Sequence, residues 1–448
     1  MNEGLQNEEA VSNAQLSRSV GWITWSGLVN IANSVAVWIF MARMRDVDEV
    51  GRFAIVMGIY ALFNTIVSLG LMNYLINEIS RRRTAGIEGT GSLHKFLSSA
   101  AIFLLISGIF SAVAMSVTGF ALSESWEVRI STLILSPALI PTGLVTLLEA
   151  SAISFGRARL VAKATTVENI LRTVIPLGFI VAGFDMWAIC ASFAVVRFIA
   201  LLVYLLAARG HLARFQFSNF EFHSILAIFP TFAGTIIFAS INWQASLLLL
   251  GYLSSEAETA KYGAASRFLV PASILMASYA SVIQPSVARY AMQIKEQLGS
   301  YLAKTARIPL ILATLAAVAS PFLSGPILAF MFGPSYEAAG STLNILALSM
   351  IPFCLVIVSA SGLVATGSQR VDLFANILGA IVCIGSGAIL IPRYGAVGAA
   401  AAQLFSFLSM ALVEVTYLSR TLGGFRIWRA ASVSTASLVM IYAIIWKL

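Results

Sequence analysis

The chain has 448 residues, of which 59% are hydrophobic and 11% are charged. Soluble domains contain roughly 45–50% apolar and about 25% charged residues, so a soluble core could not bury this much apolar surface. The formal net charge is +8, but the sequence lacks the basic, aromatic-studded soluble face that a nucleic-acid partner would require. The composition therefore predicts an integral membrane protein with no nucleic-acid partner.

The first 18 residues form a polar and acidic tail. No short apolar run precedes a small-residue cleavage site there, which argues against a cleaved signal peptide. We expect residues 1–18 to be a cytosolic tail.

Apolar stretches of about 20 residues follow, each long enough to cross about 30 Å of hydrocarbon at about 1.5 Å per residue. Because backbone groups in lipid must be hydrogen-bonded within the segment, these stretches predict helices rather than strands. The expected spans are 19–42, 53–76, 96–120, 130–153, 166–183, 187–207, 225–251, 264–288, 308–332, 341–365, 373–391 and 396–419. A shorter thirteenth span is expected at 430–446, between Trp428-Arg429 and Trp446-Lys447, the aromatic and basic residues typical of membrane interfaces.

The loops between these spans carry an asymmetric basic charge. With the amino terminus inside, 18 Lys and Arg residues lie on the cytoplasmic side and eight on the opposite side, counting Lys447. Cytoplasmic loops of membrane proteins are enriched in Lys and Arg, so the count predicts a cytosolic amino terminus. The net positive charge mainly indicates topology and contact with anionic membrane lipids.

Two loops recur in the second half of the chain. Asp48–Ala54 lines up with Ala257–Gly263 at an offset of 209, and the turn Gly156–Arg159 lines up with Gly367–Arg370. Six predicted helices separate the copies, and an even number places both halves in the same orientation, as in parallel repeats. Chance similarity between apolar helices is the alternative.

The repeat predicts two six-helix bundles that face each other across a transporter-like cleft. The expected parts are an amino-terminal bundle at 19–208, a cytosolic linker at 209–224, a carboxy-terminal bundle at 225–420 and an additional transmembrane segment at 421–448.

Several short segments also follow a known family pattern in order and spacing. They are Met41–Phe53, Leu69–Asn73 with Arg81–Arg83, Gly156–Arg159, Phe229-Pro230, Glu258–Tyr262, Ala365–Arg370 and Ile391–Ala399. Over about residues 19–420 the chain resembles the polysaccharide-biosynthesis, or oligosaccharide flippase, family of the multidrug/oligosaccharidyl-lipid/polysaccharide (MOP) exporter superfamily.

The resemblance implies two pseudo-symmetric six-helix halves around a central cavity. It also implies a substrate, a polyprenyl-pyrophosphate-linked oligosaccharide moved to the outer leaflet of the bacterial inner membrane for O-antigen, capsule or exopolysaccharide synthesis. Polysaccharide polymerase machinery and membrane lipids are the implied partners. One terminal hydrophobic segment departs from the family pattern, which has none or a pair.

Ionisable residues inside the predicted spans are the candidates for function, because each costs about 2.5–3.5 kcal/mol at a helix centre. Arg197 lies near the middle of span 187–207. A guanidinium can bind a pyrophosphate bidentately and stays charged, so Arg197 is the first candidate for substrate binding, with a structural ion pair as the alternative. Glu168 and Arg172 are four residues apart on one helix face, a spacing that favours a pair that neutralises itself, although Arg172 is a second candidate for substrate binding.

Glu149, Glu168 and Glu414 are the candidates for ion coupling. For Glu149 the alternative is a side chain that extends to the lipid headgroups. Amide and indole groups could contact a glycan, because amides hydrogen-bond sugar hydroxyls and indoles stack on sugar faces; in membranes amides also hold helices together. These substrate-binding candidates are Trp25, Asn30, Asn33, Asn242, Trp243 and Gln244.

The sequence contains no nucleotide-binding motif, and no His, Cys and carboxylate cluster has metal-ligand spacing, so we expect no cofactor and no catalytic or metal site. Transport would then use an ion gradient and membrane potential. The alternatives in the same fold are a drug exporter and a flippase for lipid-linked peptidoglycan precursors. A membrane glycan polymerase or ligase is a distant alternative, because the predicted outer loops are short and contain no His.

The topology can be tested with reporter fusions. Fusions in the loops 76–95 and 209–224 should report the cytosol, and fusions near Ser125 and Ser255 should report the outside, because of the basic-charge asymmetry. A fusion at Leu448 should report the outside if 430–446 spans the membrane. The reverse pattern at the first four sites would contradict the predicted orientation.

Overall fold

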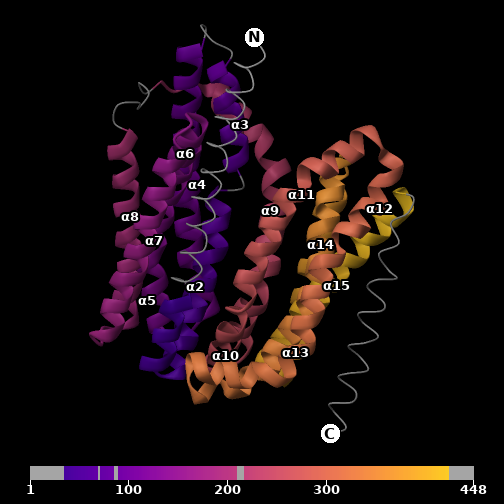
Figure 1. The fold of residues 1–448 in the computed structure, drawn as a ribbon. Coiled ribbons are helices and arrows are strands. Elements are labelled where there is room, and N and C mark those ends of the chain that lie inside the picture. Colours follow the sequence, from indigo (N-terminus) through magenta and orange to yellow (C-terminus); the bar gives the residue numbers. More distant parts are fainter. Residues whose placement is uncertain (1–34, 69–70, 85–88, 209–215, 423–448) are drawn as a thin grey trace, which may run out of the picture. The chain divides into compact units, whose positions relative to one another are not determined.

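The computed structural model describes residues 35–68, 71–84, 89–208 and 216–422, drawn in colour in Figure 1. Within these ranges every regular element is an α-helix or a short 3-10 helix, which confirms the predicted all-α membrane fold. Ten helices in the described part are long and apolar enough to span a membrane. The predicted span 430–446 and most of the predicted span 19–42 lie outside the described residues.

The chain divides into two compact units, each with its own core. Among the described residues, unit 1 comprises those between 35 and 44 and between 59 and 236, and unit 2 comprises those between 45 and 58 and between 237 and 422. Two long helices therefore contribute to both units: α2 (Val47–Ser68) begins in unit 2, and α9 (Asn219–Leu253) begins in unit 1.

Unit 1 is built from helices that lie side by side along their length (Figure 1). In it, α4 packs on α6 and α8 packs on both α7 and α5. Its elements between α2 and α9 are α3 (Leu71–Thr84), α4 (Gly89–Leu122), α5 (Trp126–Leu135), η1 (Ser136–Ala138), α6 (Leu139–Ser154), α7 (Ala158–Val181) and α8 (Met186–Ala208).

The predicted span 53–76 is wrong at both ends, because α2 starts at Val47 and ends at Ser68, and α3 begins at Leu71. Asp48 and Glu49 occupy the first turn of α2, where negative charge stabilises the positive end of the helix dipole. Their polarity suggested a loop, but in this position they favour an earlier helix start.

Arg82 connects three helices at one end of unit 1. Its guanidinium donates to both carboxylate oxygens of Glu221 on α9, at 2.7 and 2.9 Å, and to Glu78 on its own helix at 2.7 Å. The same group lies 4.6 Å from the centroid of the Phe96 ring on α4. A hydrogen bond from Arg81 holds the pKa of Glu78 below its usual value. Arg82, from the Arg81–Arg83 motif, therefore fixes the start of α9 onto α3.

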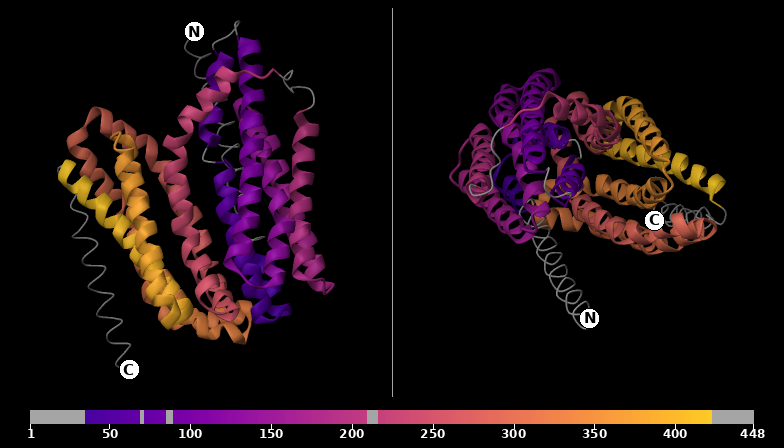
Figure 2. Two further views of the ribbon diagram at one scale, coloured as in Figure 1. Left: turned by 180° about the vertical axis from the view of Figure 1, so that it is seen from behind. Right: turned by 90° about the horizontal axis from the view of Figure 1, so that it is seen from above.

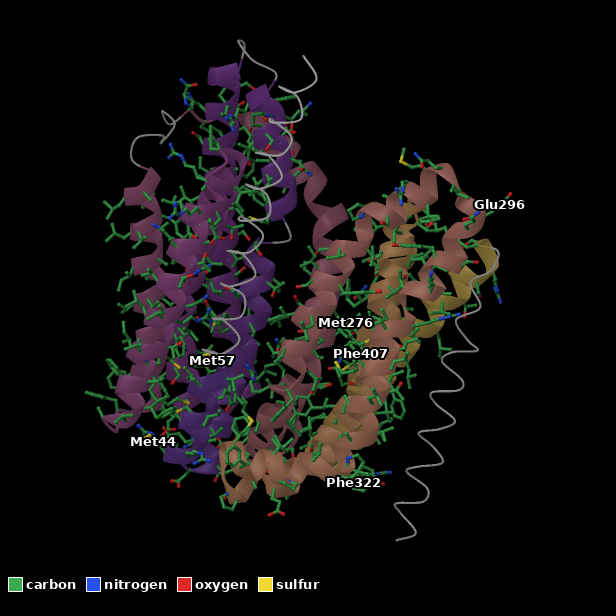
Figure 3. The ribbon with its side chains drawn as sticks, viewed as in Figure 1. Met44, Met57, Met276, Glu296, Phe322 and Phe407 are labelled. Atoms are coloured by element: carbon green, nitrogen blue, oxygen red, sulfur yellow. The ribbon has the colours of Figure 1, made fainter. Side chains whose placement is uncertain are left out.

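Unit 2 contains the remaining helices, and α14 packs along both α13 and α15. Its elements after α9 are α10 (Glu256–Ser266), α11 (Leu269–Gln293), α12 (Lys295–Thr305), α13 (Arg307–Phe332), η2 (Pro334–Ala339), α14 (Gly340–Ala365) and α15 (Gln369–Thr421). Two views from other directions show the same packing (Figure 2). Glu296 and Phe322 mark opposite ends of this unit in Figure 3.

The last described helix, α15, is a hairpin of two arms. The chain reverses at Gly395, whose φ of 53° and ψ of −128° are non-helical. A Cβ placed on Gly379 would lie 2.7 Å from Cγ of Met410, so the arms pack against each other. The arms correspond to the predicted spans 373–391 and 396–419.

The repeated loop motif holds this hairpin together. Glu258 accepts a hydrogen bond from the backbone N–H of Ala396 at 2.8 Å, the first residue after the reversal, and pairs with Lys261 at 2.7 Å. The free N–H groups at a helix start favour an anionic acceptor, so Glu258 caps the second arm.

The two copies of the glycine turn, Gly156–Arg159 and Gly367–Arg370, have the same backbone conformation. Gly156 after α6 has a φ of 74°, and Gly367 after α14 has a φ of 73°. In both copies the next N–H bonds back to a carbonyl five residues earlier, from Arg157 to Ala152 and from Ser368 to Leu363, each at 2.8 Å. This is the Schellman ending, which favours glycine because only glycine adopts a positive φ without strain.

Gly51 on α2 allows a close approach to α10. A Cβ at this position would lie 1.9 Å from the backbone oxygen of Glu256. Arg52 then reaches the Glu256 carboxylate at 2.6 Å. The small and basic residues of the repeated motif therefore join these two helices within unit 2.

Replacing Gly51 with Ala should destabilise the protein, because the added methyl group would overlap backbone atoms that cannot rotate away. Overpacking of this kind costs about 1–3 kcal/mol or more. We expect Gly51→Ala to lower the midpoint of thermal unfolding of the detergent-purified protein. Gly385→Ala is the matched control, since nothing lies within 4 Å of its added Cβ and alanine favours a helix. An unchanged midpoint for Gly51→Ala would contradict the close contact.

Candidate functional site

Three neighbouring helices of unit 1 each direct two polar side chains to the same place. The two members of a pair are seven residues apart on α6 and α8 and three apart on α7. The pairs are Thr142 with Glu149 on α6, Arg197 with Tyr204 on α8, and Thr165 with Glu168 on α7. These spacings put both members of each pair on one helix face. Because α6, α7 and α8 pack against one another, the six side chains meet in one polar cluster.

Arg197 is the cation of this cluster. Its Nη1 lies 2.5 Å from Oε1 of Glu168, and its Nε donates to Oγ1 of Thr142 at 3.1 Å. The Arg197 side chain is 18% exposed and the Glu168 side chain 7%. Arg197 therefore has a carboxylate partner on the adjacent helix. This is the structural ion pair that was the alternative to a role in substrate binding. Its guanidinium still has N–H groups beyond those two contacts that can donate to a second anion.

The second part of the cluster lies one to two turns away. Tyr204 donates from its hydroxyl group to Oε1 of Glu149 at 2.8 Å, and the Thr165 hydroxyl lies 3.1 Å from the same tyrosine oxygen. Glu149 is thus a hydrogen-bonded carboxylate of the same cluster as Arg197 and Glu168. The structure brings two of the three ion-coupling candidates together in unit 1.

Arg172 does not form the predicted pair with Glu168. The Glu168 carboxylate pairs with Arg197, while the Arg172 guanidinium lies 5.8 Å from the centroid of the Phe193 ring on α8. The pairing inferred from the four-residue spacing is wrong because packing of α8 beside α7 offers each charge another partner. Arginine over an aromatic face is a favourable cation–π arrangement.

Asn242 joins three helical segments inside unit 2. Its Nδ2 donates to the backbone oxygen of Asn376 at 2.9 Å, and its Oδ1 accepts from Ser406 at 3.2 Å. The residue is 2% exposed. Asn242 therefore holds α9 against both arms of α15, the packing role that amides have in membranes.

Trp243, the next residue, packs in an aromatic group. Its ring centroid lies 5.4 Å from that of Phe353 and 6.0 Å from that of Phe407. Phe407 lies on α15, in the same unit as Met276 of α11 (Figure 3). Gln244 is half-buried on α9. The other three glycan-contact candidates, Trp25, Asn30 and Asn33, lie outside the described residues.

The third ion-coupling candidate, Glu414, lies in unit 2 and is fully buried on the second arm of α15. The candidates predicted from the sequence thus fall into two groups, Arg197 with Glu149 and Glu168 in unit 1, and Glu414 in unit 2.

Sequence reasoning missed four residues that complete these groups. Thr142, Thr165 and Tyr204 were passed over because none of them carries a charge, although each lies three or seven residues from a predicted site residue on its own helix. Asp372 was passed over because it lies at the edge of a predicted span. A search for polar residues at helical spacing from each buried charge would have found the first three.

Comparisons with known proteins identify the family of the chain and proteins that share its fold. The family model described as polysaccharide biosynthesis protein matches residues 16–291. Lipid II flippase MurJ in an inward closed conformation is similar in structure, at 16% identity over 96% of this chain and 92% of that chain, with a TM-score of 0.75. No curated protein sequence matches the chain significantly.

Multidrug transporters share the same fold. An inward-facing multidrug resistance MATE family transporter of the MOP superfamily is 14% identical over 92% of this chain and 96% of that chain, with a TM-score of 0.72. The MATE transporter VcmN of Vibrio cholerae is 14% identical over 93% and 99%, with a TM-score of 0.59. The fold is that of a multi-pass membrane transporter of the MOP superfamily. Since its model matches more than half of the sequence, the chain belongs to the polysaccharide biosynthesis protein family.

Removing one member of the ion pair of unit 1 should destabilise the protein strongly, because the other charge is left without its partner. Such a loss costs about 3–5 kcal/mol. We expect Glu168→Gln to lower the thermal midpoint of the purified protein, and the double variant Glu168→Leu with Arg197→Met to recover most of it.

Glu124→Gln is the control for this comparison, because Glu124 is an exposed residue between α4 and α5. It should leave the midpoint unchanged. Equal midpoints for Glu168→Gln and the wild type would show that the Arg197 charge does not depend on Glu168 for its compensation.

Proposed function

We propose that this protein is a flippase that moves polyprenyl-pyrophosphate-linked oligosaccharide units across the bacterial inner membrane. The units would supply O-antigen, capsule or exopolysaccharide synthesis, and transport would proceed by ion-coupled alternating access. Membership of the polysaccharide biosynthesis family supports a lipid-linked glycan as the substrate, and the MOP fold supports transport rather than catalysis.

The observation that carries the proposal is the half-buried guanidinium of Arg197, held by the buried carboxylate of Glu168 inside unit 1. A pyrophosphate offers oxygen pairs that match the planar fork of arginine. Substrate binding would place its oxygens on the N–H groups of Arg197 that Glu168 and Thr142 leave available. The positive charge would then offset the cost of removing the anionic linkage from water.

Glu168 and Thr142 have a positioning role in this proposal. Between them they fix two nitrogens of the guanidinium, so the fork is oriented before substrate arrives. Such preorganisation lowers the entropic cost of binding. Glu149, which accepts a hydrogen bond from Tyr204 beside the pair, is the proposed ion-coupling carboxylate of unit 1.

Substrate class separates the proposed function from its alternatives. A flippase for lipid-linked peptidoglycan precursors would also bind a pyrophosphate. Loss of that flippase, however, would affect cell-wall synthesis rather than surface polysaccharide. A drug exporter would change drug resistance instead. Neighbouring genes for glycosyltransferases and a polymerase would favour the glycan.

The role of Arg197 can be measured as surface polysaccharide in a flippase-deficient strain complemented with each variant. Arg197→Ala should lose most of the polysaccharide, because the charge is gone. Arg197→Lys should retain part of it, because it keeps the charge but lacks the bidentate fork. The amount of membrane-inserted protein is measured alongside.

Arg129→Ala serves as the control, since Arg129 is an arginine of unit 1 that donates to the Ser123 backbone oxygen outside the polar cluster. It should leave polysaccharide unchanged. Normal polysaccharide with Arg197→Ala at a normal protein level would rule out a required anion-binding role. Loss of the Arg197→Ala protein itself would mean that the residue acts through folding.

A further inference from the structure

Unit 2 contains a pair of acidic side chains that the sequence did not connect. Asp372 lies in the first turn of the first arm of α15, and Glu414 lies in the second arm. The arms pack antiparallel, as shown by the Gly379–Met410 contact and by a 3.1 Å contact between the hydroxyl groups of Ser368 and Tyr417. These contacts bracket the two acids, so Asp372 and Glu414 lie at the same level of the hairpin, and each carboxyl group acts on the other.

Glu414 is unusual among the acids of the described residues. Its exposed fraction is 0%, and neither of its carboxylate oxygens receives a hydrogen bond. A buried carboxylate without a donor is costly, because desolvation of the charge is not offset. A proton on one of the two acids would remove this cost, since the protonated group would donate to the other.

Asp372 differs from Glu414 in its surroundings. It is half-buried, and its Oδ1 accepts a hydrogen bond from Nδ2 of Asn376 at 3.0 Å. Asn376 in turn receives the bond from Asn242, so an amide chain connects the acid to α9. Asp372 therefore forms the more accessible, hydrogen-bonded end of the pair, and Glu414 the buried end.

The described charges near the pair do not include a cation that could neutralise it. Among the elements packed on α15, α14 has no acidic or basic residue, and neither does the part of α9 in unit 2. The charged residues of α10, including Glu258 and Lys261, lie at the opposite end of the hairpin, by Ala396. On α15 itself, Arg370, Arg393 and Arg420 are exposed. Lys304 of α12, the helix whose Leu302 meets Leu418 at Gly362, is exposed as well, and Asp372 is the charged group that acts on Glu414.

We propose that Asp372 and Glu414 form a proton-binding site in unit 2, in which the two carboxylates share one proton taken up from water at Asp372. Binding forms one O–H bond and cancels one negative charge, and release returns the proton to water. A role for this proton in driving transport rests on the proposed function, whereas proton binding itself does not. The proton and the anionic substrate would then bind in different units.

The proton can be detected without any substrate. Dicyclohexylcarbodiimide reacts with protonated carboxyl groups in apolar surroundings, and mass spectrometry locates the adduct. In the full-length protein in lipid nanodiscs at neutral pH, we expect labelling at Glu414 or Asp372 that decreases as pH rises. Glu258, which is paired with Lys261, is the internal control and should stay unlabelled.

Two variants test whether the acids act as a pair. Glu414→Gln is a neutral mimic of the protonated acid, so it should fold normally and abolish labelling at both positions. Asp372→Asn removes the like charge and supplies an amide donor, so labelling of Glu414 at neutral pH should fall about tenfold. Glu414→Asp should keep part of the labelling.

Absence of label at both acids in the wild type would overturn the proposal, as would Asp372→Asn labelling at the wild-type level. Protection by sodium, compared with potassium at the same ionic strength, would assign the site to a metal cation and also overturn it. These results do not depend on which substrate is moved. Unchanged surface polysaccharide in Arg197→Ala would contradict the proposed function, but it would say nothing about the proton site.

Discussion

A charge buried in the bilayer needs a partner within the protein, and this constraint decides where the polar residues of the protein lie. Water is absent from the hydrocarbon core, so each guanidinium or carboxylate must find its donor or acceptor on a neighbouring helix. Arg197 meets Glu168 and Thr142 from two different helices for this reason. The packing of α6, α7 and α8 and the geometry of the polar cluster therefore depend on each other.

The same constraint explains why Asp372 and Glu414 differ from the other buried acids. Glu149 and Glu168 each have a hydrogen-bond donor, whereas the oxygens of Glu414 have none among the described residues. A group that lacks a donor in one protonation state can be satisfied in another. Unit 1 thus presents a compensated cation, and unit 2 presents acids whose protonation state can change.

The repeat has a physical basis in the loops more than in the helices. Gly156 and Gly367 end equivalent helices in the same left-handed conformation, and each turn places a polar N–H on a free carbonyl. Any apolar residue of suitable size can face lipid, so helix sequences diverge with little cost. A turn that needs a positive φ restricts the residue to glycine, and such positions stay recognisable in both halves.

The sequence by itself determined the class of fold. Apolar stretches of membrane-spanning length and a backbone that must bond within itself specify a helical membrane protein, whatever the packing is. It also identified the buried charges, since Arg197, Glu168, Glu149 and Glu414 stand out against apolar neighbours. Helix ends were less certain, because Asp48 and Glu49 suit both a loop and the first turn of α2.

Only the tertiary structure decided which of these charges meet. Spacing along one helix favoured Glu168 with Arg172, but α8 packs beside α7 and supplies Arg197 as the partner. Asp372 and Glu414 are separated by a reversal at Gly395, and only the folding of α15 onto itself brings them together. Spacing describes neighbours on one helix, whereas contact between helices depends on their relative rotation and register, which side-chain packing sets over the whole interface.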